Sequence, residues 1–301
     1  MPSDVSAPFA RGGAPEPVRR VSALLQQRLF GRSDLDYRVP RGDPGLFGPD
    51  SVTWRVHSNP VSLAVGGIAA VILELAEPRV RTGVWDHSSF RTDPLARIRR
   101  TGQAAMVTTY GPRAAAEARI AQVNRMHRKV AGTTPEGQPY HAMDPELLEW
   151  VQLTASYGFL NAYLRLVGPL KPADQDRYYV EGAHLGAAFG AEGMPKSVDE
   201  AEAHIRDMRP KLKAHPIIGE FLGLVSKASP VGLPGRLIQP FVVQAAIDLL
   251  PAWTRAQLEL PVRPARSTAA YPMLRAMAVS ARFLPDSIPA QAYARMGRRM
   301  A

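Results

Sequence analysis

The chain contains no cysteine among its 301 residues, and this absence removes several kinds of site. Without thiols it can form no disulfide bond, no iron–sulfur cluster and no thiolate-ligated haem, and it lacks the ligands of the usual structural zinc sites. Covalent attachment of a c-type haem also needs cysteines. Any metal centre in this protein must therefore use other side chains.

Lysine is scarce. Only six of the 37 basic residues are lysines, so the net charge of +10 comes mostly from arginine. A basic balance can indicate nucleic acid, a membrane surface or the anionic groups of a ligand. Here the arginines are spread along expected helices, without a dense basic run or interleaved aromatic residues. We therefore expect no specific nucleic-acid partner.

Long hydrophobic runs are missing as well. Residues 1–17 are rich in Pro, Gly, Ala and Ser and have no apolar core, so we expect a disordered arm and not a signal peptide. The most apolar segment, Val61–Ala76, is shorter than the roughly 18–20 residues of a membrane span. It is expected to be a buried core helix of a soluble, cytoplasmic protein with no transmembrane segment.

Helical patterning dominates the rest of the chain. No sustained period-2 alternation occurs, so we predict an all-α fold in which residues 18–301 form one multi-helix domain around a buried apolar pocket. The segments 82–90 and 132–144 are expected to be connectors. The expected helices are 18–30, 51–57, 61–76, 94–110, 112–130, 147–167, 174–189, 198–208, 216–225, 238–250 and 265–284.

An antiparallel helical hairpin is predicted between residues 93 and 132. Asp93 suits an N-cap and Pro94 the first helical position. Gly111 and Pro112 end one helix and begin the next. The turn between them is short, so the two helices should lie side by side.

The hairpin places a few polar side chains at a similar distance from its turn. Arg97, Arg100 and Thr101 share one face of the first helix, and His127 lies on an otherwise apolar face of the second. Counted from the turn, His127 is only about three residues farther out than Arg97, roughly 5 Å at 1.5 Å per residue. One imidazole and two guanidiniums are therefore expected near one another.

The histidines are the only candidates for neutral metal ligands, and no two of them form a paired-ligand motif. They are His57, His87, His127, His141, His184, His204 and His215. No nucleophile-elbow, P-loop or dinucleotide fingerprint occurs, so acyl hydrolysis, nucleotide chemistry and nicotinamide binding have no positive support.

Each hairpin residue has an ordinary interpretation and a functional one. His127 is either a hydrogen-bonded core residue or an axial ligand to haem iron, with His87, His141 and His184 as the next candidates. The arginines are either solvated partners of nearby carboxylates such as Asp93 and Glu117, or they bind haem propionates or oxygen.

Several ordered motifs carry a resemblance to a known family. They are Trp85–Phe90, Asp93–Thr101, His127–Gly132, Tyr140–Val151, Asp176–Tyr179 and, more weakly, Leu249–Trp253. Together they resemble the oxygenase MpaB family, which includes the bacterial latex-clearing proteins, or rubber oxygenases, and a fungal endoplasmic-reticulum oxygenase. The likeness spans roughly residues 43–260.

The resemblance implies an all-α fold around haem b, with a histidine as the iron ligand. By spacing, the ligand histidine falls nearest His127. The R-x-x-K-T pattern of the latex-clearing branch matches Arg97, Arg100 and Thr101, with arginine in place of the lysine. The resemblance thus assigns catalytic roles to these three residues and makes Arg97 and Arg100 cofactor-binding as well.

Two positions depart from the family pattern. The acidic residue used as a base in the latex-clearing branch has no clear counterpart, and Glu74 and Glu77 are merely nearby. Gln152 stands where many members have histidine after Trp-Val.

Two functional hypotheses follow from the sequence. The first is a haem-dependent oxygenase that uses O2 in a dioxygenase-type cleavage of an apolar, possibly isoprenoid or other alkene-containing substrate. The second is a non-catalytic protein that binds haem or another hydrophobic ligand.

Overall fold

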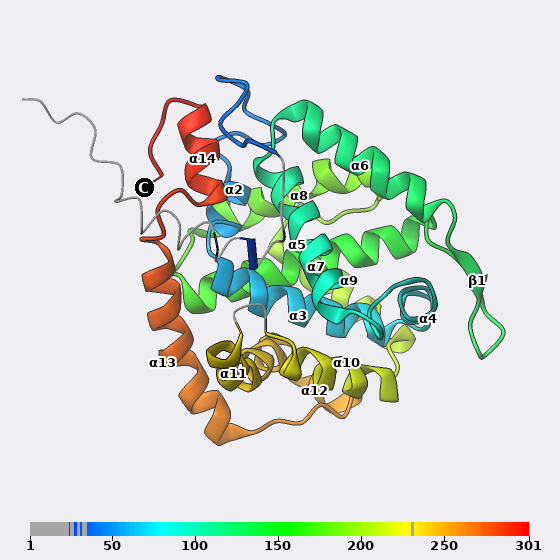
Figure 1. Ribbon diagram of the computed structural model, residues 1–301. Coiled ribbons are helices and arrows are strands. Elements are labelled where there is room, and N and C mark those ends of the chain that lie inside the picture. Colours follow the sequence, from blue (N-terminus) through cyan, green and yellow to red (C-terminus); the bar gives the residue numbers. More distant parts are fainter. Residues whose placement is uncertain (1–23, 25–26, 29–30, 32–34, 230–231, 301) are drawn as a thin grey trace, which may run out of the picture.

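The computed structural model describes residues 24, 27–28, 31, 35–229 and 232–300. The expected arm 1–17 and most of the expected helix 18–30 lie outside these residues. The described chain confirms the all-α prediction (Figure 1). Its helices are α2 (Val52–Val56), α3 (Pro60–Ala76), α4 (Pro78–His87), α5 (Pro94–Tyr110), α6 (Arg113–His127), α7 (Pro145–Leu166), α8 (Pro172–Phe189), α9 (Val198–Asp207), the 3-10 turn η1 (Arg209–Lys211), α10 (Pro216–Lys227), α11 (Leu233–Leu249), α12 (Ala252–Gln257), α13 (Pro264–Ala281) and α14 (Ile288–Arg295).

Helices α3 and α7 form the centre of the molecule. They run antiparallel, since Trp150 Nε1 donates to Leu73 O over 3.2 Å near one end of the contact and Gly66 meets Gly158 farther along. A Cβ atom on Gly66 would lie 2.6 Å from the carbonyl oxygen of Gly158, a distance that side chains do not tolerate. Glycine at this crossing therefore lets the two backbones touch.

Other helices cover this central pair from several sides. In the view of Figure 1, α11 and α12 lie below α3, α13 runs down the left side, and the hairpin of α5 and α6 lies above α3. The predicted hairpin is present: the Asp93 side chain accepts a hydrogen bond from Ala96 N, and the chain turns at Gly111 and Pro112. The main core joins residues of α3, α7 and α11, as the buried character predicted for 61–76 requires.

Two expected connectors contain regular structure. Segment 82–90 lies mostly within α4, which begins after Glu77 because its side chain accepts a hydrogen bond from Val80 N. Segment 132–144 includes strand β2 (Pro139–His141), paired antiparallel with β1 (Ala131–Thr133). The connector prediction was wrong at both places.

Among the residues that the structure describes, no single helix is long and apolar enough to span a membrane. Helices α3 and α4 meet that test only as a pair, and they are bent by 109° relative to each other.

Candidate functional site

The hairpin brings two of the predicted residues together. Arg97, near the start of α5, and His127, the last residue of α6, are both partly buried. Burial lowers the pKa of His127, and the positive charge of Arg97 lowers it further. The two side chains therefore lie within electrostatic reach of each other, as their positions along the hairpin predicted.

His127 carries a ring nitrogen that lacks a partner. Its Nδ1 atom is buried and has no hydrogen-bond partner within the described part of the chain. Buried polar atoms without a partner are rare in native proteins, and they call for a specific explanation. Because its pKa is lowered, the imidazole is neutral at neutral pH, which is the form that binds metal ions.

Glu74 joins this pair from α3. Burial raises its pKa to about 7, against the opposing effects of the Arg97 charge and the Thr154 hydroxyl. The Thr154 Oγ1 atom on α7 lies 3.5 Å from Glu74 Oε1. Glu74 lies deep among protein atoms, although the residue as a whole keeps some accessible surface.

Arg97 is the cation at the centre of the group. Burial lowers its pKa, Glu74 raises it again, and Arg100 contributes a smaller lowering. An arginine starts from so high a value that it stays protonated after such a shift. The site thus consists of a carboxyl group, a guanidinium and a neutral imidazole from three helices, which we call the Glu74–Arg97–His127 group.

Arg100 and Thr101 have different surroundings. Both are exposed. The Arg100 guanidinium donates to Ser89 Oγ, and the Thr101 hydroxyl donates to the carbonyl oxygen of Arg97 over 3.1 Å. No contact shown by the structure directs either side chain toward His127, and their catalytic roles remain predictions.

The carboxylates suggested as ordinary partners of the arginines have other contacts. Asp93 caps α5 through Ala96 N, and Glu117 lies 3.6 Å from Arg113 in a surface ion pair. Among the described residues, neither carboxylate is shown in contact with the guanidinium of Arg97 or Arg100.

The alternative histidines fit a ligand role less well. His87, His141 and His184 are exposed, and His87 lies 3.1 Å from the Tyr140 hydroxyl. His57 is buried, but both of its ring nitrogens have partners, Thr109 at 2.9 Å and Tyr178 at 3.0 Å. Burial lowers the pKa of His57 to about 4.

A bare metal ion lacks a suitable ligand cluster here. Within the described ranges, no group of three or more histidine, aspartate or glutamate side chains is placed to hold one. Gln152, where family members often have histidine, is half-buried on α7. A cofactor that needs only one protein ligand is compatible with this arrangement.

The sequence profile of the family described as "ER-bound oxygenase mpaB/B'/Rubber oxygenase, catalytic domain" matches residues 54–283. The chain belongs to this family. The matched range runs from α2 to just past α13 and includes all three members of the Glu74–Arg97–His127 group. No curated protein and no solved structure gives a match.

The residues present fit the haem that such a family implies. A neutral imidazole with an unpartnered nitrogen would suit a single iron ligand, and a partly buried guanidinium would suit a propionate carboxylate. From the sequence, Glu74 is only one of two nearby carboxylates and has no assigned role. The available signal was a carboxylate inside the most apolar helix of the chain, where an ionisable side chain is unusual.

Proposed function

We propose that this protein is a haem b-dependent oxygenase acting on an apolar, alkene-containing substrate such as an isoprenoid. The observation that carries the proposal is His127, with its unpartnered ring nitrogen, near the partly buried Arg97 and Glu74 inside an oxygenase domain. Perturbed ionisable groups that converge from different helices are typical of functional sites.

In this proposal His127 holds the iron through its neutral imidazole, and Arg97 binds a propionate. Arg100 is close enough to influence Arg97 and can bind the second propionate from the exposed side. When bound, haem supplies the site at which O2 is taken up and reduced.

Glu74 is the group that can exchange a proton. With a pKa of about 7, its carboxyl group is present in both forms near neutral pH, so it can accept a proton from a substrate carbon and return it to an oxygen atom. Arg97 holds a fixed positive charge beside it. In a site with little water, such a charge stabilises negative charge that develops during the reaction.

The apolar substrate would lie along α3 and α7. Val71 and Gly67 precede Glu74 by about one and two turns on the same face of α3, and both are half-buried. A Cβ atom on Gly67 would lie 3.7 Å from the ring of Phe159 on α7, which is also half-buried. These surfaces can bind a hydrocarbon chain and exclude water from the carboxyl group of Glu74.

Haem binding is tested at His127. We expect His127→Ala to lose most of its haem, measured as the Soret absorbance per protein after purification and after reconstitution. The matched control is His184→Ala, because His184 is an exposed histidine on α8. Equal Soret absorbance in wild type and His127→Ala would show that His127 is not the ligand.

Catalysis is tested with the reduced, haem-loaded protein and a panel of isoprenoids under ¹⁸O2. Oxidative cleavage of a carbon–carbon double bond by a dioxygenase places label in both carbonyl ends, detected by mass spectrometry. Haem binding without labelled products from any isoprenoid would instead support the non-catalytic, ligand-binding function.

A further inference from the structure

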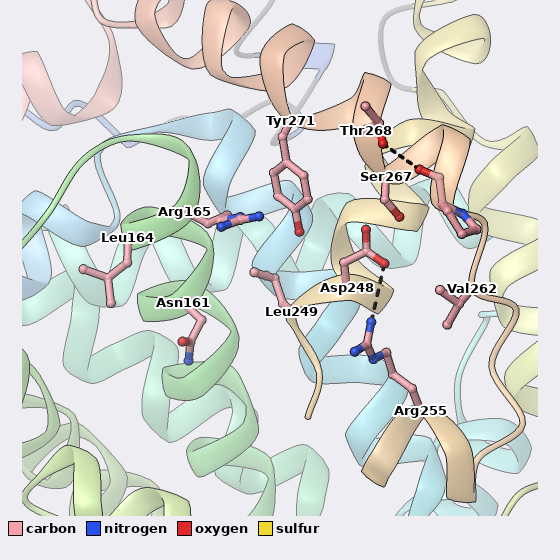
Figure 2. A pocket seen from close by; sticks show the side chains of 11 residues that line it. Asn161, Leu164, Arg165, Asp248, Leu249, Arg255, Val262, Ser267, Thr268 and Tyr271 are labelled. Atoms are coloured by element: carbon pink, nitrogen blue, oxygen red, sulfur yellow. Dashed lines mark hydrogen bonds and ion pairs between the residues drawn. The ribbon is translucent and has the colours of Figure 1, made fainter. Parts of the chain in front are cut away.

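A second candidate site lies away from the Glu74–Arg97–His127 group. A pocket of about 710 Å³ opens between α7, α11, α12 and α13, and it shares no residue with the Glu74–Arg97–His127 group (Figure 2). Its size is within the range of small-molecule sites, about 300–1,000 Å³. Its charged lining residues are Arg165, Asp248 and Arg255.

Asp248 is the buried acceptor of this pocket. Its side chain is only 9% exposed. Oδ1 accepts a hydrogen bond from Gln244 Nε2 over 2.9 Å, whereas Oδ2 is buried and has no partner among the described residues. In Figure 2 this second oxygen points toward Ser267 and Tyr271. A carboxylate only accepts hydrogen bonds, so Oδ2 needs a donor.

Arg255 is the complementary donor. Its Nε is also buried and unpartnered in the described part of the chain, and its Nη1 lies 3.8 Å from Asp248 Oδ1, beyond hydrogen-bond distance. The pocket thus has one unpaired donor atom and one unpaired acceptor atom, on an arginine and an aspartate that form only a long ion pair with each other. Leaving such groups unpaired costs free energy that a suitable ligand would recover.

The charges that line the pocket favour an anionic ligand. Arg165 and Arg255 outweigh Asp248 by one positive charge, so a ligand with one negative charge makes the site neutral. The Arg165 guanidinium lies 4.2 Å from the centre of the Tyr271 ring, which holds it at the pocket wall. The apolar lining residues are Leu164, Leu249 and Val262, which lie on different sides of the pocket in Figure 2, and an apolar group of the ligand can lie against them.

We propose that this pocket binds a small monocarboxylate that carries a neighbouring hydroxyl group and a short apolar part. The carboxylate binds Arg255 and Arg165, and the hydroxyl donates to Asp248 Oδ2. A hydroxyl satisfies Oδ2 without adding charge, whereas an ammonium group would leave the site with its positive excess.

Four compounds with the same carbon skeleton test the proposed contacts one at a time. Mandelate carries both groups, phenylacetate lacks the hydroxyl, 1-phenyl-1,2-ethanediol lacks the carboxylate, and phenylglycine replaces the hydroxyl with an ammonium. In calorimetric titrations of the full-length protein we expect mandelate to bind most tightly, by about tenfold over phenylacetate, since one hydrogen bond to a charged group distinguishes them.

Substitutions of the lining residues test whether the ligand binds in this pocket. Arg255→Gln should weaken mandelate binding about tenfold or more. Asp248→Asn should remove the preference for mandelate over phenylacetate. Arg206→Gln and Asp199→Asn change exposed residues of α9 and should bind like wild type. Thr268→Trp fills the exposed mouth from α13 without touching the buried charges, and should abolish binding.

Several results would overturn the proposal. These are no binding by any of the four compounds, tighter binding of phenylglycine than of mandelate, and a mandelate preference that survives in Asp248→Asn. Unchanged binding by a folded Thr268→Trp protein would place the ligand elsewhere on the molecule.

Discussion

At Glu74, burial makes ionisation of a single side chain costly for the folded state. Its pKa of about 7 compares with 4.5 for an ordinary glutamate. Between these values the native protein binds more protons than the unfolded chain does. The contribution of Glu74 to the free energy of unfolding therefore falls as pH rises from about 4.5 to about 7.

Replacing Glu74 with Gln removes this pH dependence. We compare the free energy of unfolding of Glu74→Gln with that of wild type. We expect the difference to shift by about 1–3 kcal/mol in favour of the variant from pH 5 to pH 8. Urea unfolding of the haem-free protein at both pH values measures the change. Glu117→Gln, at an exposed glutamate of α6, is the control. Parallel stability curves for wild type and Glu74→Gln would mean that Glu74 ionises normally.

Arg97 and Arg100 offer a matched pair that differs in burial. Arg97 is partly buried near Glu74 and His127, whereas Arg100 is exposed. We expect Arg97→Gln to weaken haem retention about tenfold or more, and Arg100→Gln to weaken it only a few-fold, because exposed charge pairs contribute little. Haem-transfer titrations to apomyoglobin compare the two. Equal losses would place both side chains at equivalent positions relative to the cofactor.

The residues of the site differ in how far the sequence could predict them. The proximity of Arg97 and His127 follows from a short turn and the helical repeat, which are local properties of residues 93–127. The approach of Glu74 depends on how α3 packs in the folded core, and no local pattern encodes that. Sequence alone therefore placed two members of the group together and could not choose the third, Glu74, over its neighbour Glu77.

Among the helices, the crossing of α3 and α7 sets the position of Glu74 and Thr154. Gly66 and Gly158 allow the backbones to touch, and Thr154, one turn before Gly158, then comes opposite Glu74. A methyl group at Gly66 would push the helices apart, because its nearest neighbours are backbone atoms of α7, which cannot rotate away.

We expect Gly66→Ala to lower the free energy of unfolding by about 1–3 kcal/mol, as overpacked cores do. Gly219→Ala is the control. Gly219 lies in α10, where an added Cβ meets nothing within 4 Å, so alanine should be neutral or stabilising by up to about 1 kcal/mol. Urea unfolding compares both variants with wild type. A Gly66→Ala protein as stable as Gly219→Ala would show that the crossing is loose.

The helices that the sequence predicted correctly begin with clear local signals. Asp93, Asp144 and Ser197 accept hydrogen bonds at the starts of α5, α7 and α9, and aspartate and serine are preferred N-cap residues. Helix α4 was missed because glutamate, the cap that starts it at Glu77, is not among the preferred N-cap residues. The strands β1 and β2 have three residues each, too short for an alternating pattern to be recognised.

On the scale of the whole molecule, one buried arginine joins segments from opposite ends of the described chain. Arg295 of α14 is only 1% exposed. It donates to the carbonyl oxygens of Tyr37 at 2.7 Å, Asp43 at 2.7 Å and Tyr110 at 2.8 Å. It thereby fixes the loop before α2 and the C-terminal end of α5, the helix that carries Arg97.

Arg295→Met keeps much of the side-chain volume and removes every one of these donors. We expect it to lower the free energy of unfolding by about 3–5 kcal/mol, because several buried carbonyl groups lose their partner at once. Arg298→Met is the matched control, since Arg298 is exposed and its ion pair with Asp50 lies on the surface, worth about 0–1 kcal/mol. Urea unfolding at one pH measures both. Similar stabilities for the two variants would mean that the segments around Arg295 are held together by apolar packing alone.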